Sequence, residues 1–82
     1  MEFNYVELSA EDEEIVQSLP LREVSNPVWA DVFHQIYTAP NGSLTVTGRD
    51  YGGSWGAYAR VPAGTTDEEI IKEYNQMMEE QG

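Results

Sequence analysis

The sequence predicts a single α+β domain in which a small antiparallel sheet packs against a C-terminal helix. Three observations predict this fold: strand-like alternation in the middle of the chain, a turn motif between two such segments, and a helical apolar pattern near the C-terminus. A chain of 82 residues corresponds to one domain, residues 1–82. We expect three or four strands, and a short N-terminal helix at an edge of the sheet or in the same layer as the C-terminal helix.

The first part of the chain predicts one short strand and one short helix. Residues 3–8 alternate weakly and are rich in β-forming residues, which favours a strand. Ser9 is a typical N-cap, and the acidic turn that follows complements the helix dipole. Pro20 ends the helix. The buried side of this helix would consist of Ile15, Val16 and Leu19.

An irregular connection and a β-hairpin are expected in the middle of the chain. Residues 20–30 contain two prolines and predict a loop anchored by Val28 and Trp29. The alternating patterns that follow predict strands at 31–38 and 43–48.

The hairpin turn allows two interpretations. Asn41-Gly42 alone suits a two-residue turn, whereas Pro40-Asn41-Gly42 suits a type I turn followed by a left-handed glycine bulge. We favour the second, because all three residues then occupy positions that they prefer. The predicted pairs are Ser43 with Ala39, Leu44 with Thr38, and Val46 with Ile36. One face then carries Val32, Ile36, Leu44 and Val46, and the other carries Phe33, Gln35, Tyr37, Thr45 and Thr47.

The remaining segment predicts a loop, a third strand and the final helix. Residues 48–54 are rich in glycine and are expected to form a loop that leads to a strand at 55–61. The small residues Ala57 and Ala59 indicate the close approach of a helix. A capping box, Thr66 to Glu69, begins that helix. One apolar stripe follows at helical spacing and consists of Ile70, Tyr74, Met77 and Met78, with Ile71 beside them.

Charge is concentrated at the two ends of the chain, and it is negative. Residues 1–26 carry a net charge of −6, residues 65–82 carry −5, and the middle is neutral, which gives the formal total of −11. An ordered domain with this field repels nucleic acid and anionic membranes and attracts basic surfaces. We therefore expect a basic protein surface as partner, and neither nucleic acid nor membrane.

No catalytic or metal-binding motif is present. His34 is the only histidine, and no serine lies in a strand–nucleophile–helix signature. The acids from Glu11 to Glu14 lack the alternate spacing and central glycine of a calcium loop. The glycine-rich segment 48–54 is not followed by the lysine or helix start of a phosphate loop. We expect a non-enzymatic protein without metal or cofactor, in which His34 is a packed or surface residue of a strand.

The expected location is the cytoplasm. The chain has no cysteine, which excludes disulfides and thiolate metal sites and favours a reducing compartment. Its N-terminus lacks the pattern of a signal peptide, and no apolar run approaches the roughly 20 residues of a membrane helix.

The acidic clusters form the candidate binding site. Carboxylates one helical turn apart have Cβ atoms roughly 5–6 Å apart, and rows of them resemble the charge density of a phosphate backbone. Aromatic anchors would add affinity, because charge contributes mainly orientation and association rate. The candidate contact residues are Glu11, Asp12, Glu13, Glu14, Glu69, Glu73, Glu80, Tyr51, Trp55 and Tyr37. Aromatic side chains on one sheet face (Phe33, Tyr37, Tyr58) fit either a protein contact or a core under the first helix.

In size, charge and lack of catalytic motifs, the chain resembles small acidic proteins of phages and mobile elements. These include anti-restriction and anti-CRISPR inhibitors and the uracil-DNA glycosylase inhibitor. The resemblance implies a non-enzymatic inhibitor or adaptor that mimics nucleic acid and occupies a basic site on a nucleic-acid-processing host protein. It rests on no matched residues, so no residue roles carry over. The alternative is a structural or assembly module, such as a homodimer, acting through a sheet face or edge. A generic acidic domain and salt adaptation would also explain the charge.

Overall fold

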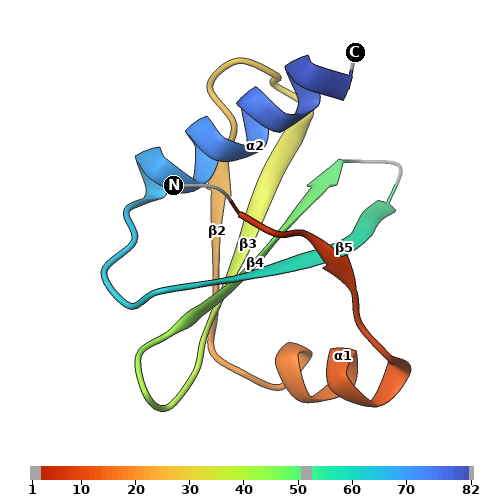
Figure 1. Ribbon diagram of the computed structural model, residues 1–82, viewed down its shortest axis with the longest axis vertical. Coiled ribbons are helices and arrows are strands. Elements are labelled where there is room, and N and C mark those ends of the chain that lie inside the picture. Colours follow the sequence, from red (N-terminus) through yellow and green to blue (C-terminus); the bar gives the residue numbers. More distant parts are fainter. Residues whose placement is uncertain (1–2, 51–52, 82) are drawn as a thin grey trace.

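The computed structural model describes residues 3–50 and 53–81 and shows an antiparallel sheet with one helix on each face (Figure 1). The elements along the chain are β1 (Val6–Glu7), α1 (Ala10–Gln17), β2 (Leu21–Ser25), β3 (Val32–Thr38), β4 (Leu44–Asp50), β5 (Gly53–Val61) and α2 (Asp67–Gln81). Five strands form one sheet in the order β1-β5-β4-β3-β2, with every neighbouring pair antiparallel. The fold is therefore α+β, as predicted, with more strands than expected. The expected position of the first helix, at an edge or in the layer of α2, is wrong, because α1 covers the opposite face of the sheet. Neither of the helices in the described residues is long and apolar enough to cross a membrane.

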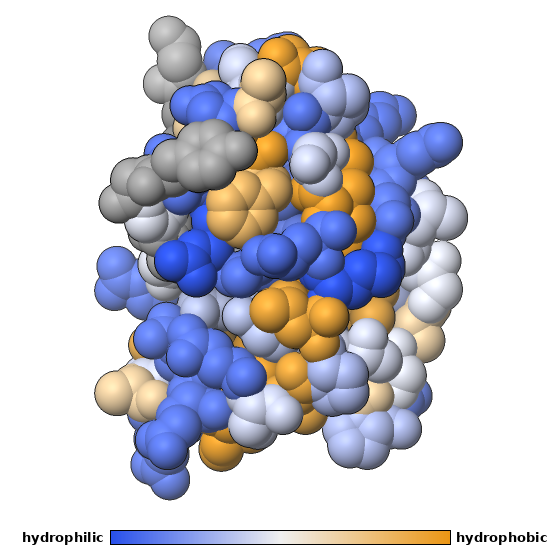
Figure 2. Space-filling model, turned by 180° about the vertical axis from the view of Figure 1, so that it is seen from behind, coloured by the Kyte–Doolittle hydropathy of each residue, from blue (hydrophilic) through white to orange (hydrophobic). Residues whose placement is uncertain are grey.

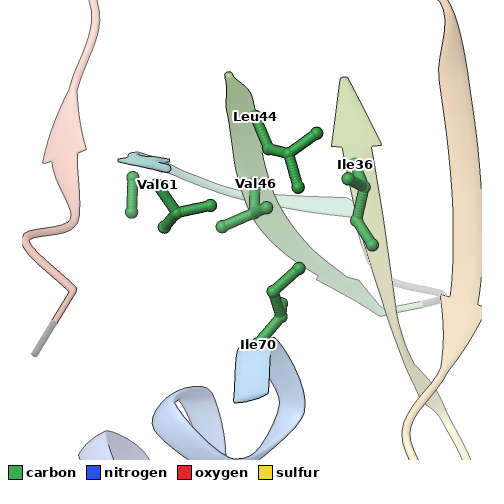
Figure 3. Packing of buried hydrophobic residues seen from close by; sticks show 6 residues of the cluster. Ile36, Leu44, Val46, Val61 and Ile70 are labelled. Carbon is green, nitrogen blue, oxygen red and sulfur yellow. The ribbon is translucent and has the colours of Figure 1, made fainter. Parts of the chain in front are cut away.

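The larger core lies between α2 and one face of the sheet. Ile36, Val46 and Ala59 lie side by side across three strands and are at most 1% exposed. Ile70 extends from the first turn of α2 toward these strands and is fully buried (Figure 3). Ile70 and Tyr74 are one helical turn apart, and both are buried. The apolar stripe of α2 therefore packs on the sheet, and its polar side faces solvent.

The β3–β4 turn confirms the predicted type I turn with a glycine bulge. The Gly42 N–H donates to the carbonyl of Ala39 at 2.9 Å, and Gly42 has a φ of +89°. The Ala39 N–H donates to the Ser43 carbonyl at 2.9 Å, and Leu44 pairs with Thr38 as expected. This register assigns the side chains of both strands to the predicted faces.

The smaller core lies between α1 and the opposite face of the sheet. Val16 packs with Tyr37 and Tyr58, and all three side chains are buried. Of the two interpretations of the aromatic sheet face, a core under the first helix is therefore correct for Tyr37 and Tyr58. The expected burial of Ile15 is wrong, because its side chain is 58% exposed. A helix of eight residues buries only a narrow stripe, and Ile15 lies about 100° around the helix from Val16.

The segment predicted to be an irregular loop contains an additional edge strand. β2 pairs with β3 from Leu21 to Ser25. Pro20 precedes the strand, and its carbonyl accepts the first ladder bond from the Thr38 N–H at 3.1 Å. Of the two expected anchors, Val28 is 65% exposed, whereas the half-buried Trp29 packs against Tyr74.

Two further boundaries differ from the expectation. Within the expected strand 3–8, only Val6–Glu7 pairs with β5. The glycine-rich segment is partly strand, since β4 continues to Asp50 and β5 begins at Gly53. Gly48 lies inside β4, where an added Cβ would come within 2.6 Å of the Tyr74 ring. Its small size therefore allows α2 to approach the sheet.

Replacement of Ile70 by alanine is expected to lower the free energy of unfolding by about 2–5 kcal/mol, because it leaves a cavity between α2 and the sheet. Urea denaturation measures the change. Ile15→Ala is the matched control, since it removes the same atoms from an exposed helical position. This control should change the free energy by less than about 0.5 kcal/mol. Equal losses in the two variants would contradict the assigned core.

Candidate functional site

Three acidic residues of α2 lie along one side of the helix, next to its buried apolar stripe. Glu69 and Glu80 are exposed, and Glu73 is half-buried. Successive residues of an α-helix are rotated by 100°, so these three carboxylates lie within about 40° of one another and span about 16 Å of the helix axis. We call Glu69, Glu73 and Glu80 the α2 stripe. The structure thus brings together three of the predicted site residues.

Glu69 also has a structural role at the start of α2. Its backbone N–H donates to Thr66 Oγ1 at 3.2 Å, and its Oε1 accepts from the Thr66 N–H at 3.3 Å. The predicted capping box is therefore confirmed. The nearby Asp67 forms an ion pair with Arg22, so its charge is compensated within the molecule.

A groove beside the α2 stripe joins two of its carboxylates to aromatic side chains. The groove has a volume of about 440 Å³ and is lined by Phe3, Tyr5, Lys72, Glu73, Gln76, Met77 and Glu80. Burial raises the pKa of Tyr5, and the neighbouring Tyr74 and the charge of Glu73 raise it further. The influence of Glu73 on Tyr5 indicates that a carboxylate and an aromatic ring lie close together in this groove.

The groove has the chemistry of a site for a cationic side chain. Carboxylates bind ammonium and guanidinium groups through charge-assisted hydrogen bonds, and aromatic rings attract the same cations. Met77 and the aromatic rings offer apolar surface to the aliphatic stem of a lysine or arginine. Lys72 already lines the groove, so an incoming cation would compete with it.

The acidic cluster of α1 forms a separate surface. Glu11, Asp12 and Glu14 are exposed, and Glu13 is half-buried. The Asp12 N–H donates to Ser9 Oγ at 3.1 Å, which confirms the predicted N-cap. Since α1 and α2 cover opposite faces of the sheet, the structure does not bring the two predicted acidic clusters together.

The predicted aromatic anchors are not available as a set. Tyr37 was expected to be a contact residue, but it is only 4% exposed because α1 covers it. Tyr51 and the side chain of Trp55 lie outside the described residues. Phe3 and Tyr5, which sequence reasoning assigned only to a strand, are the aromatic residues beside the acids.

Polar groups crowd the sheet face around Tyr37. The Tyr37 hydroxyl donates to Gln35 Oε1 at 3.4 Å, and Gln35 Nε2 donates to Glu23 at 3.1 Å. Burial raises the pKa of Tyr37, Tyr58 and nearby carboxylates add to this effect, and Arg49 opposes it. Seen from behind, hydrophobic side chains form separate patches between hydrophilic ones (Figure 2).

His34 belongs to a buried polar network beneath α2, as a packed strand residue. Asn26 Nδ2 lies 3.1 Å from His34 Nε2 and donates to Asn75 Oδ1 at 2.7 Å. Asn26 Oδ1 accepts the N–H groups of Val28 and Trp29, which fixes the orientation of the amide. Asn26 therefore donates to Nε2, and the neutral imidazole carries its proton on Nδ1. The network connects the β2–β3 loop to α2. In the sequence, its only signals were a lone histidine and an Asn-Pro pair.

The environment of His34 disfavours its charged form. The side chain is fully buried, and the edge of the ring contacts Tyr74 at a centroid distance of 4.8 Å. Burial lowers the pKa of His34 below its usual value of 6.5. Protonation would also place an N–H donor of the imidazolium opposite the NH₂ donor of Asn26.

Within residues 3–50 and 53–81, no group of three or more histidine, cysteine, aspartate or glutamate side chains is arranged to hold a metal ion. Comparisons of the chain with protein-family models, with curated proteins and with solved structures find no match.

The pKa of His34 predicts acid-sensitive stability. Because the unfolded chain binds a proton near pH 6.5 and the folded chain binds it only at lower pH, the free energy of unfolding should fall as the pH drops below about 6.5. The slope should reach at most about 1.4 kcal/mol per pH unit, and urea denaturation between about pH 7.5 and 5.5 measures it. His34→Gln keeps an acceptor for Asn26 but does not titrate, so it should show less of this decline. Parallel curves for both proteins would rule out the assignment.

Proposed function

We propose that the protein is a non-enzymatic inhibitor or adaptor of the nucleic-acid-mimicking type, which binds a basic surface of a nucleic-acid-processing protein through α2. The observation that carries this proposal is the groove in which Glu73 and Glu80 lie beside Phe3 and Tyr5. It joins charge to apolar contact at one place between α2 and the N-terminal segment.

The rigidity of α2 supports this function. The helix has 15 residues, and its apolar stripe is held by Ile70 and Tyr74 in the larger core. Carboxylates on such a helix keep fixed spacings, which allows them to match cationic groups that are arranged for phosphates. Like charges on one helix also oppose folding, so their presence in a small domain is consistent with a use in binding.

The groove would supply specificity that charge alone does not. A lysine or arginine of the partner would place its cation between Glu73 and Glu80 and its stem on Phe3 and Met77. Cation–π contacts contribute about 0.5–2 kcal/mol, depending on how far they are removed from water. The remaining carboxylates of α2 would orient the approach and increase the association rate.

The position of His34 supports a non-enzymatic role. It is the only histidine of the chain, and its imidazole is fully buried beneath α2. A substrate at the surface would not reach this side chain as a general base.

The immobilised chain should retain DNA- or RNA-binding proteins from a bacterial lysate at about 50 mM salt and release them at about 500 mM, because ion pairing with a polyanion is screened by salt. Duplex DNA should displace the retained proteins, since in this proposal DNA and the chain bind the same site on each of them. Quantitative mass spectrometry of the eluates measures both effects. Retention that is insensitive to duplex DNA would contradict nucleic-acid mimicry.

Neutralising the groove should weaken binding of an acetylated hexaarginine amide about tenfold, which corresponds to about 1.4 kcal/mol. The variant is Glu73→Gln/Glu80→Gln, and NMR signals of Phe3, Tyr5 and Met77 report the contact. The control is Glu68→Gln/Glu79→Gln, which makes the same charge change about 100–140° around the helix. Equal losses in the two variants would show that only net charge matters.

A further inference from the structure

β2 offers an open edge on the side of the sheet away from β3. It is the last strand in the order β1-β5-β4-β3-β2, and Figure 1 shows it beside β3 at the margin of the sheet. The Pro20 carbonyl bonds to the Thr38 N–H, and the Asn26 N–H bonds to the Val32 carbonyl. In an antiparallel ladder these bonds occur at every second residue. Arg22 and Val24 therefore direct their backbone groups at β3, and the residues between them direct theirs outward.

The outward backbone groups belong to Leu21, Glu23 and Ser25. None of them has a hydrogen-bond partner among the described residues. Pro20 does not block this edge, because its missing N–H lies on the β3 side. The open stretch ends where the chain bends at Pro27. These three alternate residues each direct one N–H donor and one C=O acceptor outward, and together they form a template for an added strand.

The side chains along β2 define the chemistry of that strand. Glu23 lies on the α1 face of the sheet, where its carboxylate accepts only the neutral amide of Gln35 among the described residues. Arg22 lies on the α2 face, and its charge is compensated by Asp67. The uncompensated charge of the edge is therefore negative.

A hollow with a mixed polar and apolar lining lies at the C-terminal end of the edge. It has a volume of about 190 Å³ and is lined by Glu23, Val24, Ser25, Ala30, Val32 and Phe33. A strand added beside β2 would pass this hollow and could insert one apolar side chain. Alternation then places basic side chains on the Glu23 face and apolar side chains on the Val24 face.

A second copy of the chain fits this edge poorly. Pairing the whole of β2 with the same strand of another copy would place Glu23 directly opposite its own counterpart, and like charges in this position are destabilising. Each copy also carries a net charge of −11. A basic partner meets neither obstacle.

We propose that β2 binds an extended segment of a basic protein as an antiparallel sixth strand, with a basic residue opposite Glu23 and apolar residues on the Val24 face. This interface lies on a different element from the α2 stripe. If binding at the β2 edge or at the α2 stripe is disproved, the other interface can still be tested.

The test uses an acetylated and amidated octapeptide of alternating lysine and valine, added to the ¹⁵N-labelled protein. In antiparallel pairing the residues opposite Leu21, Glu23 and Ser25 donate their own N–H groups, and in this proposal they are lysines. Amide shifts should concentrate at Leu21, Glu23 and Ser25. N-methylation of the lysine amides should weaken binding more than tenfold, whereas N-methylation of the valine amides should leave it within about threefold.

Two variants of the protein complete the experiment. Glu23→Pro removes an outward N–H that the fold does not use, and it should reproduce the loss seen with the methylated lysine peptide. Glu23→Gln should weaken binding severalfold and reduce its dependence on salt. The proposal is overturned if the two methylated peptides bind equally, if a glutamate–valine peptide binds as well, or if shifts occur only on α2. The arm with methylated peptides remains decisive even where Glu23→Pro fails to fold.

Discussion

The contact between α2 and the sheet determines which surfaces the protein presents. Ile70 is fully buried among the side chains of β3, β4 and β5, and Tyr74 packs where Gly48 leaves room. These two contacts orient the helix about its axis. The α2 stripe then faces solvent, and Glu73 and Glu80 come to lie beside the N-terminal segment. The groove is therefore a consequence of how the larger core is packed.

The two faces of the sheet have different roles because their side chains differ. The α2 face is apolar across its centre and forms the larger core. The α1 face carries tyrosines, threonines and Gln35. The short helix α1 covers only part of this face, and polar contacts such as that between Tyr37 and Gln35 complete the packing. In a domain of this size such partial burial leaves little margin of stability, and a surface rich in carboxylates reduces it further.

Sequence reasoning predicted the elements whose signals are local. The Pro40-Asn41-Gly42 turn fixed the β3–β4 register, and the Thr66 capping box marked the start of α2. It missed β2, because two flanking prolines resembled a loop and the pairing partner that makes Leu21–Ser25 a strand lies elsewhere in the chain. It named Tyr37 as a candidate contact residue and left a core under the first helix open, because only the position of α1 decides which face of the sheet is covered.

The candidate site was predicted in part for the same reason. Helical spacing placed Glu69, Glu73 and Glu80 on one stripe, since this property depends on α2 alone. The separation of the α1 acids from that stripe depends on the crossing of the chain from one sheet face to the other. The proximity of Phe3 and Tyr5 to the stripe arises from tertiary packing. No periodicity within residues 3–8 contains that information.

The proposed function requires a basic partner to be held in the groove between α2 and the N-terminal segment. Hydrogen–deuterium exchange of the chain, alone and in complex with a basic protein retained from the lysate, tests this most directly. The account predicts slower exchange in residues 3–5 and 66–81, with little change in residues 10–17. Slower exchange confined to α1, or spread evenly over both helices, would contradict it.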